Sequence, residues 1–158
     1  MEQIKLGQPM FISGDMATVT SRILYYLVDL QKTAGLKKIL FLDTLNCLNP
    51  YSLAKLESQP QEIFKNIYYA RAERPYDLWT RINSSEKFIM THDVEAILIP
   101  SLSYIFKDAD KEEIAPLISH MISKISAITK KHRLITIIGN TSHQHEQVAF
   151  ASSLISHW

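Results

Sequence analysis

A chain that binds nucleotide phosphates through its backbone needs closely spaced glycines, because a Cβ atom would obstruct the approach of the phosphate. The sequence contains four glycines, namely Gly7, Gly14, Gly35 and Gly139. No two of them have the spacing of the G-x-x-x-x-G-K-[ST] phosphate loop, and no three are close enough for a dinucleotide-binding fingerprint. The usual nucleotide-binding motifs are therefore absent or degraded.

Asp43 and Cys47 are two further side chains with chemical potential, and both follow an apolar run. The run 38–43 (KILFLD) is typical of a buried strand, and α/β proteins place their sites at the carboxyl ends of parallel strands. The sequence offers Asp43 no partner base or metal, so we interpret it as a capping or inherited residue. Cys47, the only cysteine, has no evident activating histidine and is interpreted as structural.

His143, His145 and Glu146 are metal-binding residue types that lie close together in the sequence. A closed zinc site needs four ligands, so we predict a solvated loop here, with no metal and no cofactor. An enzyme that uses Asp43 or these histidines for unrelated chemistry is a further alternative. It has no convergent triad or metal set in its favour.

Basic side chains form two groups in the sequence. Lys130, Lys131 and Arg133 cluster at the predicted end of a helix, where they would interact favourably with the helix dipole or contact phosphate. Arg71 and Arg74 form the second group. These five residues are the candidates for DNA contact.

Length and composition limit the class of protein. The chain has 158 residues, which is typical of a single domain over 1–158. It has 17 Lys and Arg against 16 Asp and Glu, a net charge of +1, which excludes a nucleic-acid binder that relies on bulk positive charge. The single cysteine rules out a disulfide framework and fits a reducing compartment. With neither a signal peptide nor a membrane span in the sequence, we expect a cytoplasmic protein, or a nuclear one in a eukaryote.

The hydrophobic pattern alternates between short apolar runs and longer amphipathic segments. It predicts strands at 10–12, 38–43, 67–71, 94–99 and 134–138, and helices at 18–32, from Pro50 to Pro60, from Pro75 to Met90, and ending near Lys131 with Pro116 in the first turn. Such alternation predicts an α/β fold with a mainly parallel sheet and helices on both faces. The segment 141–158 is a loop, a helix or partly ordered, and Trp158 is expected to pack on the domain or at a subunit interface.

Five stretches, in this order, resemble the RecA-fold core of archaeal and eukaryotic recombinases, the RadA family and its paralogues. They are Phe11–Leu27, Phe41–Pro50, Ile67–Ala72, Ala96–Leu102 and Ile137–Thr141. At these five places, in the same order, the family has its phosphate loop, a second strand, a strand ending in Ala-Arg-Ala, its Walker B strand and a strand ending in Thr-Asn-Gln. The resemblance implies a three-layer RecA-like core, truncated before the family's last strands.

The sequence departs from the family at the residues that carry ATP chemistry. Aligned on Gly14, the phosphate loop has Val19 at the second glycine and Thr20 at the lysine, and only Ser21 keeps the expected hydroxyl. Pro100 replaces the Walker B aspartate, and Leu45 replaces the glutamate that orients the attacking water. Phosphoryl transfer depends on these groups for positioning and charge stabilisation. The resemblance therefore implies a catalytically degenerate core that is not an ATPase.

The family binds DNA through loops that correspond here to 106–113 and 142–147. The first contains four acids and two lysines, and the second contains neither Arg nor Lys, so both favour weak DNA contact at most. The family's N-terminal domain and Phe-x-x-Ala motif have no counterpart, which argues against a full filament.

Two hypotheses follow. The first is a non-catalytic recombinase paralogue, accessory to DNA recombination or repair, which contacts an active recombinase or another paralogue. The second is a self-associating scaffold or interaction protein with no nucleic-acid role. An exposed sheet edge that a second chain covers would favour it.

Overall fold

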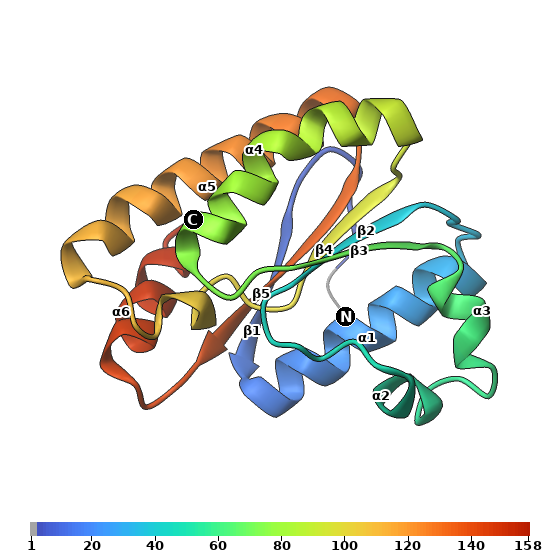
Figure 1. Cartoon of the computed structure of the whole chain (residues 1–158), viewed down its shortest axis with the longest axis horizontal. Helices are drawn as coiled ribbons and strands as arrows, with labels where there is room; N and C mark the ends of the chain where they lie inside the picture. Colours follow the sequence, from blue (N-terminus) through green and yellow to red (C-terminus); the bar gives the residue numbers. More distant parts are fainter. Residues whose placement is uncertain (1–2) are drawn as a thin grey trace.

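The computed structural model describes residues 3–158 and alternates strands with helices along the chain (Figure 1). The strands are β1 (Met10–Asp15), β2 (Ile39–Asp43), β3 (Ile67–Arg71), β4 (Ala96–Ile99) and β5 (Ile135–Ser142). The helices are α1 (Met16–Lys32), α2 (Pro50–Ala54), α3 (Pro60–Phe64), α4 (Pro75–His92), α5 (Lys111–His132) and α6 (Glu146–Ile155), with a 3₁₀ turn, η1, at Tyr104–Phe106.

All five strands are parallel and form one sheet in the order β1-β5-β4-β2-β3. Each of the four connections between strands contains at least one helix and returns the chain to the side of the sheet where the strands begin, here called the amino edge, so every connection is a crossover. The opposite side, where the strands end, is called the carboxyl edge. The sheet confirms the α/β class and the mainly parallel arrangement predicted from the sequence. This arrangement is consistent with a three-layer RecA-like core.

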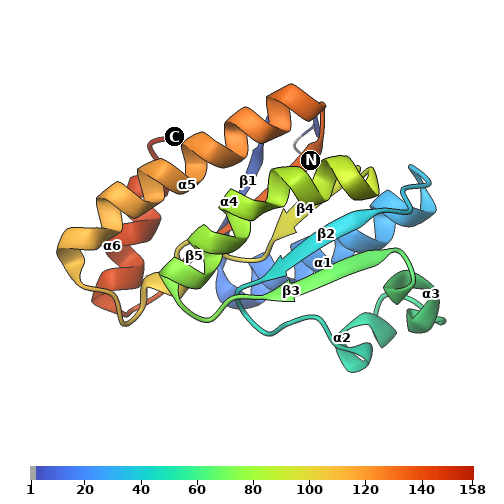
Figure 2. The same ribbon diagram turned by 45° about the horizontal axis from the view of Figure 1, so that its top comes forward.

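Side chains alternate between the two faces of the sheet, and each face is covered by its own helices. In β2, Ile39 and Phe41 pack in the core with α1, α2 and α3, whereas Leu40 and Leu42 pack in the core with α4, α5 and α6. Figure 2 shows α4 and α5 above the sheet and α2 and α3 below it. The helices on both faces explain why β2 and β4 are apolar at nearly every position.

Several element boundaries differ from the sequence-based predictions. Pro60 begins α3 instead of ending a long helix, because its missing N–H costs nothing at the first helical position. Pro116 is the sixth residue of α5, not part of its first turn. The helix runs through it because Ile114, Leu117 and Ile118 anchor the adjacent turns in the core.

The C-terminal segment is ordered into regular structure. β5 continues through Ser142, and α6 packs on the sheet through Ala151 and Ile155. Trp158 is 58% exposed, so the expectation that it packs on the domain is wrong, while a subunit interface remains a prediction. Among residues 3–158, no helix combines the length and apolar character needed to cross a membrane.

Candidate functional site

The segment from Gly14 to Ser21 forms no loop. Gly14 and Asp15 complete β1, and α1 begins at the next residue, Met16. A phosphate-binding loop needs several residues between strand and helix so that its N–H groups can surround the phosphate. Here six of those residues already belong to the helix, and the helix starts two residues earlier than the hydrophobic pattern predicts.

Asp15 occupies the N-terminus of α1 with its own carboxylate. Its Oδ1 accepts a hydrogen bond from the Thr18 amide at 2.8 Å, and its Oδ2 accepts one from the Thr18 hydroxyl at 3.1 Å. These bonds hold the pKa of Asp15 below its usual range. The helix end that attracts phosphate in nucleotide-binding proteins is therefore capped by a negative side chain of the same chain.

Val19, at the position of the family's second glycine, is fully buried between α1 and the sheet. Its Cγ1 atom lies so close to Gly139 of β5 that a Cβ built on that glycine would come within 2.7 Å of it. The same Cβ would be 1.7 Å from the carbonyl oxygen of Pro100. Val19 thus fills the space between the first turn of α1, the end of β4 and the middle of β5. Thr20 is half-buried and Ser21 is exposed.

The carboxyl ends of β2, β4 and β5 are joined by a network of buried hydroxyl groups that sequence reasoning missed. The Ser101 amide donates to Thr44 Oγ1 at 2.9 Å, and Ser101 Oγ lies 2.8 Å from Thr141 Oγ1. Ser103 Oγ donates to the Thr141 carbonyl at 2.9 Å and accepts from the Thr141 amide at 3.0 Å. The serines that follow the buried run ending at Pro100 were the available signal. Their hydroxyls bond to one another and to backbone, and the network contains no carboxylate.

Asp43 is fully buried and caps the loop that follows β2. Its carboxylate accepts hydrogen bonds from the amides of Leu45, Cys47 and Leu48 at 3.1 to 3.2 Å, and from the hydroxyl of Tyr69 at 3.1 Å. The capping role inferred from the sequence is confirmed. Leu45, at the position of the family's catalytic glutamate, is half-buried against the core beneath α1.

Cys47 lies beside Asp43, with its sulfur 3.6 Å from the carboxylate. Burial and the negative charge of Asp43 raise the pKa of this thiol far above its usual range. The thiol is thus held in its protonated, unreactive form, as a structural cysteine would be.

The tail residues His143, His145 and Glu146 do not converge. The Glu146 carboxylate lies 3.5 Å from Lys111 Nζ, and His143 Nδ1 accepts from the His145 amide at 3.0 Å. Among residues 3–158, no three His, Cys, Asp or Glu side chains are grouped in a way that could hold a metal ion.

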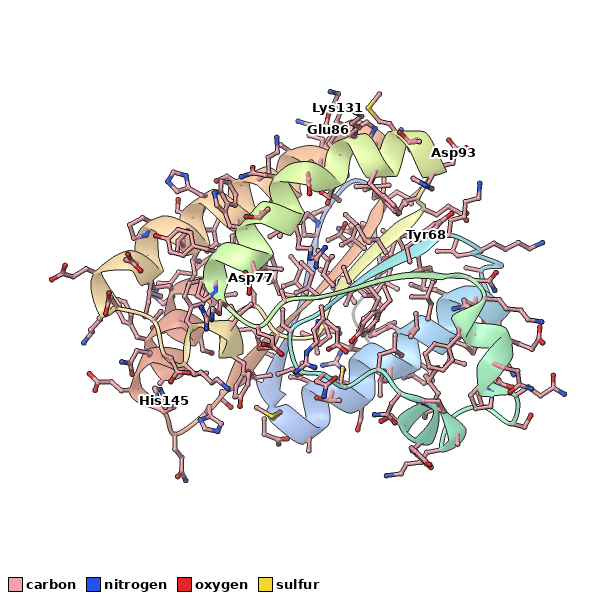
Figure 3. All side chains as sticks on the ribbon, viewed as in Figure 1. Tyr68, Asp77, Glu86, Asp93, Lys131 and His145 are labelled. Carbon is pink, nitrogen blue, oxygen red and sulfur yellow. The ribbon has the colours of Figure 1, made fainter. Side chains whose placement is uncertain are left out.

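The two basic groups lie at opposite edges of the sheet. Arg71 ends β3 and Arg74 follows it at the carboxyl edge, whereas Lys130, Lys131 and Arg133 lie at the end of α5, at the amino edge. Figure 3 shows Lys131 and Glu86 together, far from His145 at the other end of the molecule. Glu73 pairs with Arg71 at 3.0 Å and Glu86 with Lys131 at 2.8 Å. The five residues therefore form no single DNA-binding surface.

Three adjoining hollows lie at the carboxyl edge, and Glu73 lines all of them. They have volumes of about 520, 430 and 440 Å³. The second lies between the loop after β2, which leads to α2 on one face, and the segment after β4, which leads to α5 on the other. Such a change of face between neighbouring strands opens a crevice where α/β proteins bind ligands. The carboxyl edge is therefore hollowed at this crevice and at the two adjoining hollows, none of which is lined by residues at the start of α1.

The segment 106–113, aligned with a family DNA-binding loop, is only partly a loop. Phe106 ends η1, and Lys111, Glu112 and Glu113 form the first turn of α5, where acidic side chains are favoured by the helix dipole.

A scan against models of protein families finds no match to this chain, and a search of curated proteins finds none either.

Proposed function

We propose that this chain is a non-catalytic RecA-like protein that acts through contacts with a protein partner, as an accessory factor in DNA recombination or repair. The recombination role rests on the resemblance of the five sequence stretches. The partner is an active recombinase or another paralogue, and the site of action is the cytoplasm or the nucleus.

The observation that carries the non-catalytic part is the junction of β1 and α1. Asp15 caps the helix where a phosphate would bind, and Val19 fills the space beneath. A bound triphosphate would meet the Asp15 carboxylate and would lack the lysine, aspartate and glutamate that the family uses, since Thr20, Pro100 and Leu45 stand there. Charge repulsion and missing positioning groups both oppose ATP hydrolysis.

Calorimetric titration with ATP and magnesium, together with an assay for released phosphate, tests this part. We expect no micromolar binding and no turnover. Tight binding with turnover would overturn the proposal. A variant with Asp15→Ala serves as a control, because it removes the repulsion but supplies none of the missing groups.

The two free edges of the sheet favour action through a partner. Within residues 3–158, β1 pairs only with β5 and β3 pairs only with β2. Each therefore leaves one row of backbone N–H and C=O groups without a neighbouring strand, and such edges recruit strands from other chains. Beside β3, Tyr68, Ala70 and Phe88 line a hollow of about 210 Å³ that can receive a side chain.

Affinity purification from the native cells tests the partner. Recovery of a recombinase or a second paralogue supports the proposal, and a proline placed at Tyr69, in the free edge β3, should reduce the recovery. Tyr69→Phe is the matched control, because it also loses the hydroxyl bond to Asp43 but keeps the backbone N–H of the free edge.

The self-associating scaffold is the second candidate, and the same free edges favour it. Sedimentation across a range of concentrations and a DNA mobility assay at low salt discriminate the two. Self-association without DNA binding favours the scaffold. DNA binding that weakens steeply with salt favours the accessory factor.

A further inference from the structure

The third hollow of the carboxyl edge differs from the others in its charge. It has a volume of about 440 Å³ and lies between the loop after β3, the start of α4 and the segment from η1 to α5. Four carboxylates line it, from Glu73, Asp108, Asp110 and Glu113, against a single cationic side chain, Arg74.

The lining of this hollow also includes apolar and aromatic side chains. Ile105 and Ala109 are apolar, and Tyr76 is 55% exposed. The Tyr76 hydroxyl lies 3.4 Å from Glu113 Oε1. The negative charge of Glu113, with desolvation and Asp110 adding to it, raises the pKa of Tyr76, which indicates a negative potential at the mouth.

We propose that this hollow docks a basic segment of a partner protein, with an arginine side chain as its anchor. A guanidinium matches the hollow in three respects. It can stack on the face of Tyr76, its aliphatic stem can cover Ile105 and Ala109, and its N–H groups can donate to Asp108 and Glu113. This inference rests on the proposed function, because it names the chemistry of the partner.

The acidic character extends beyond the lining residues. Asp77 and Glu112 lie in the first turns of α4 and α5, each next in sequence to a lining residue, and neither has an ion-pair partner within 4.0 Å among residues 3–158. The same charges that repel a DNA phosphate would steer a basic segment toward the hollow. Figure 3 shows Asp77 at the start of α4.

Fluorescence anisotropy with a labelled Arg-Gly-Arg peptide, at low salt, tests the proposal on the full chain. The Arg-Gly-Arg peptide should bind, and a matched Glu-Gly-Glu peptide should not. In ¹⁵N NMR spectra, the amide shifts caused by the basic peptide should concentrate at 73–77 and 105–113. Shifts centred on the acids of the amino edge, such as Asp93, would overturn the proposal.

Variants separate the hollow from general charge attraction. Asp108→Asn combined with Glu113→Gln should weaken peptide binding about tenfold, whereas Asp77→Asn combined with Glu112→Gln, which removes the same charge from outside the hollow, should weaken it only slightly. Tyr76→Phe should bind as the natural chain does, and Tyr76→Ala should bind more weakly.

Two results would contradict the docking role. One is equal weakening by Asp77→Asn combined with Glu112→Gln, which would mean that only the overall field attracts the peptide. The other is competition by spermidine as effective as that by an unlabelled peptide of equal charge, which would assign the hollow to polyamines. Failure of these tests while a partner is still recovered from cells would remove this hollow and leave the proposed function standing.

Discussion

Val19 of α1 packs directly on Gly139 of β5. A Cβ atom added to Gly139 would lie 2.7 Å from Val19 Cγ1 and 1.7 Å from the Pro100 carbonyl oxygen. The contact joins the first turn of α1 to the end of β4 and the middle of β5. Two residues 120 positions apart in the sequence thereby fix how closely the helix approaches the sheet.

Gly139→Ala should therefore destabilise the protein severely, by more than the ~1–3 kcal/mol of ordinary overpacking. The nearest atoms are backbone and a rigid β-branched side chain, which cannot move aside. Gly35→Ala is the matched control. Nothing lies within 4 Å of its added Cβ, so only the positive φ opposes it, at a cost of about 1 kcal/mol. Urea unfolding of both variants measures the difference, and equal midpoints would contradict the packing described here.

The Asp15 cap should make the stability of the folded protein depend on pH in the acid range. Its pKa is lowered in the folded state, so the folded protein binds fewer protons than the unfolded chain. The stabilisation is thus complete above the unfolded pKa of about 3.9 and is lost as the pH falls through the folded value. Thermal unfolding of the natural chain and of Asp15→Asn should converge toward acid pH. A gap between the two that stays constant down to about pH 2 would argue against the cap.

Asp43 should be among the most sensitive positions of the carboxyl edge. Asp43→Ala leaves the amides of Leu45, Cys47 and Leu48 without their acceptor, and we expect a loss of ~3 kcal/mol or more in the free energy of unfolding. Tyr69→Phe removes a single donor to the same carboxylate and should cost only ~1 kcal/mol. Comparable losses in the two variants would show that the loop does not depend on the carboxylate.

Cys47 should resist alkylation in the folded protein. Because burial and Asp43 raise the pKa of its thiol, thiolate stays scarce at pH values where an exposed cysteine reacts quickly. Mass spectrometry after iodoacetamide treatment near neutral pH gives a clean readout, since the chain has no other cysteine. Urea should restore rapid labelling. Fast labelling without urea would mean that the loop after β2 opens readily.

The local residue pattern predicted those strands and caps whose structure depends mainly on neighbouring residues. The runs at 38–43 and 67–71 became β2 and β3 almost residue for residue, because continuous apolar or β-branched and aromatic side chains are typical of parallel strands. The N-cap of α2 at Asn49 also followed from its own residues, since its side chain accepts from the Ser52 amide.

The misassigned parts depend on long-range contacts. The extension of β5 through Gly139 to Ser142 requires Val19 above it and β1 beside it, in a register of Ile12 with Gly139 that no local window contains. The spacing of Asp15 and Thr18 is an N-cap signal for the start of α1, but the hydrophobic pattern predicts a start at residue 18. The hydroxyl network was missed because its members come from three separate strand ends.

The packing of Val19 against Gly139 also limits which substitutions this chain can accept during evolution. Glycine at position 19 would leave a void in the core while Asp15 still closed the first turn of the helix. Gly139, in turn, has no room for a Cβ atom, because the Pro100 carbonyl oxygen and Val19 both lie too close to it. Conversion of this backbone into a phosphate-binding loop would therefore require several of these positions to change together. A single substitution at one of them would reduce the stability of the protein without creating a phosphate-binding site.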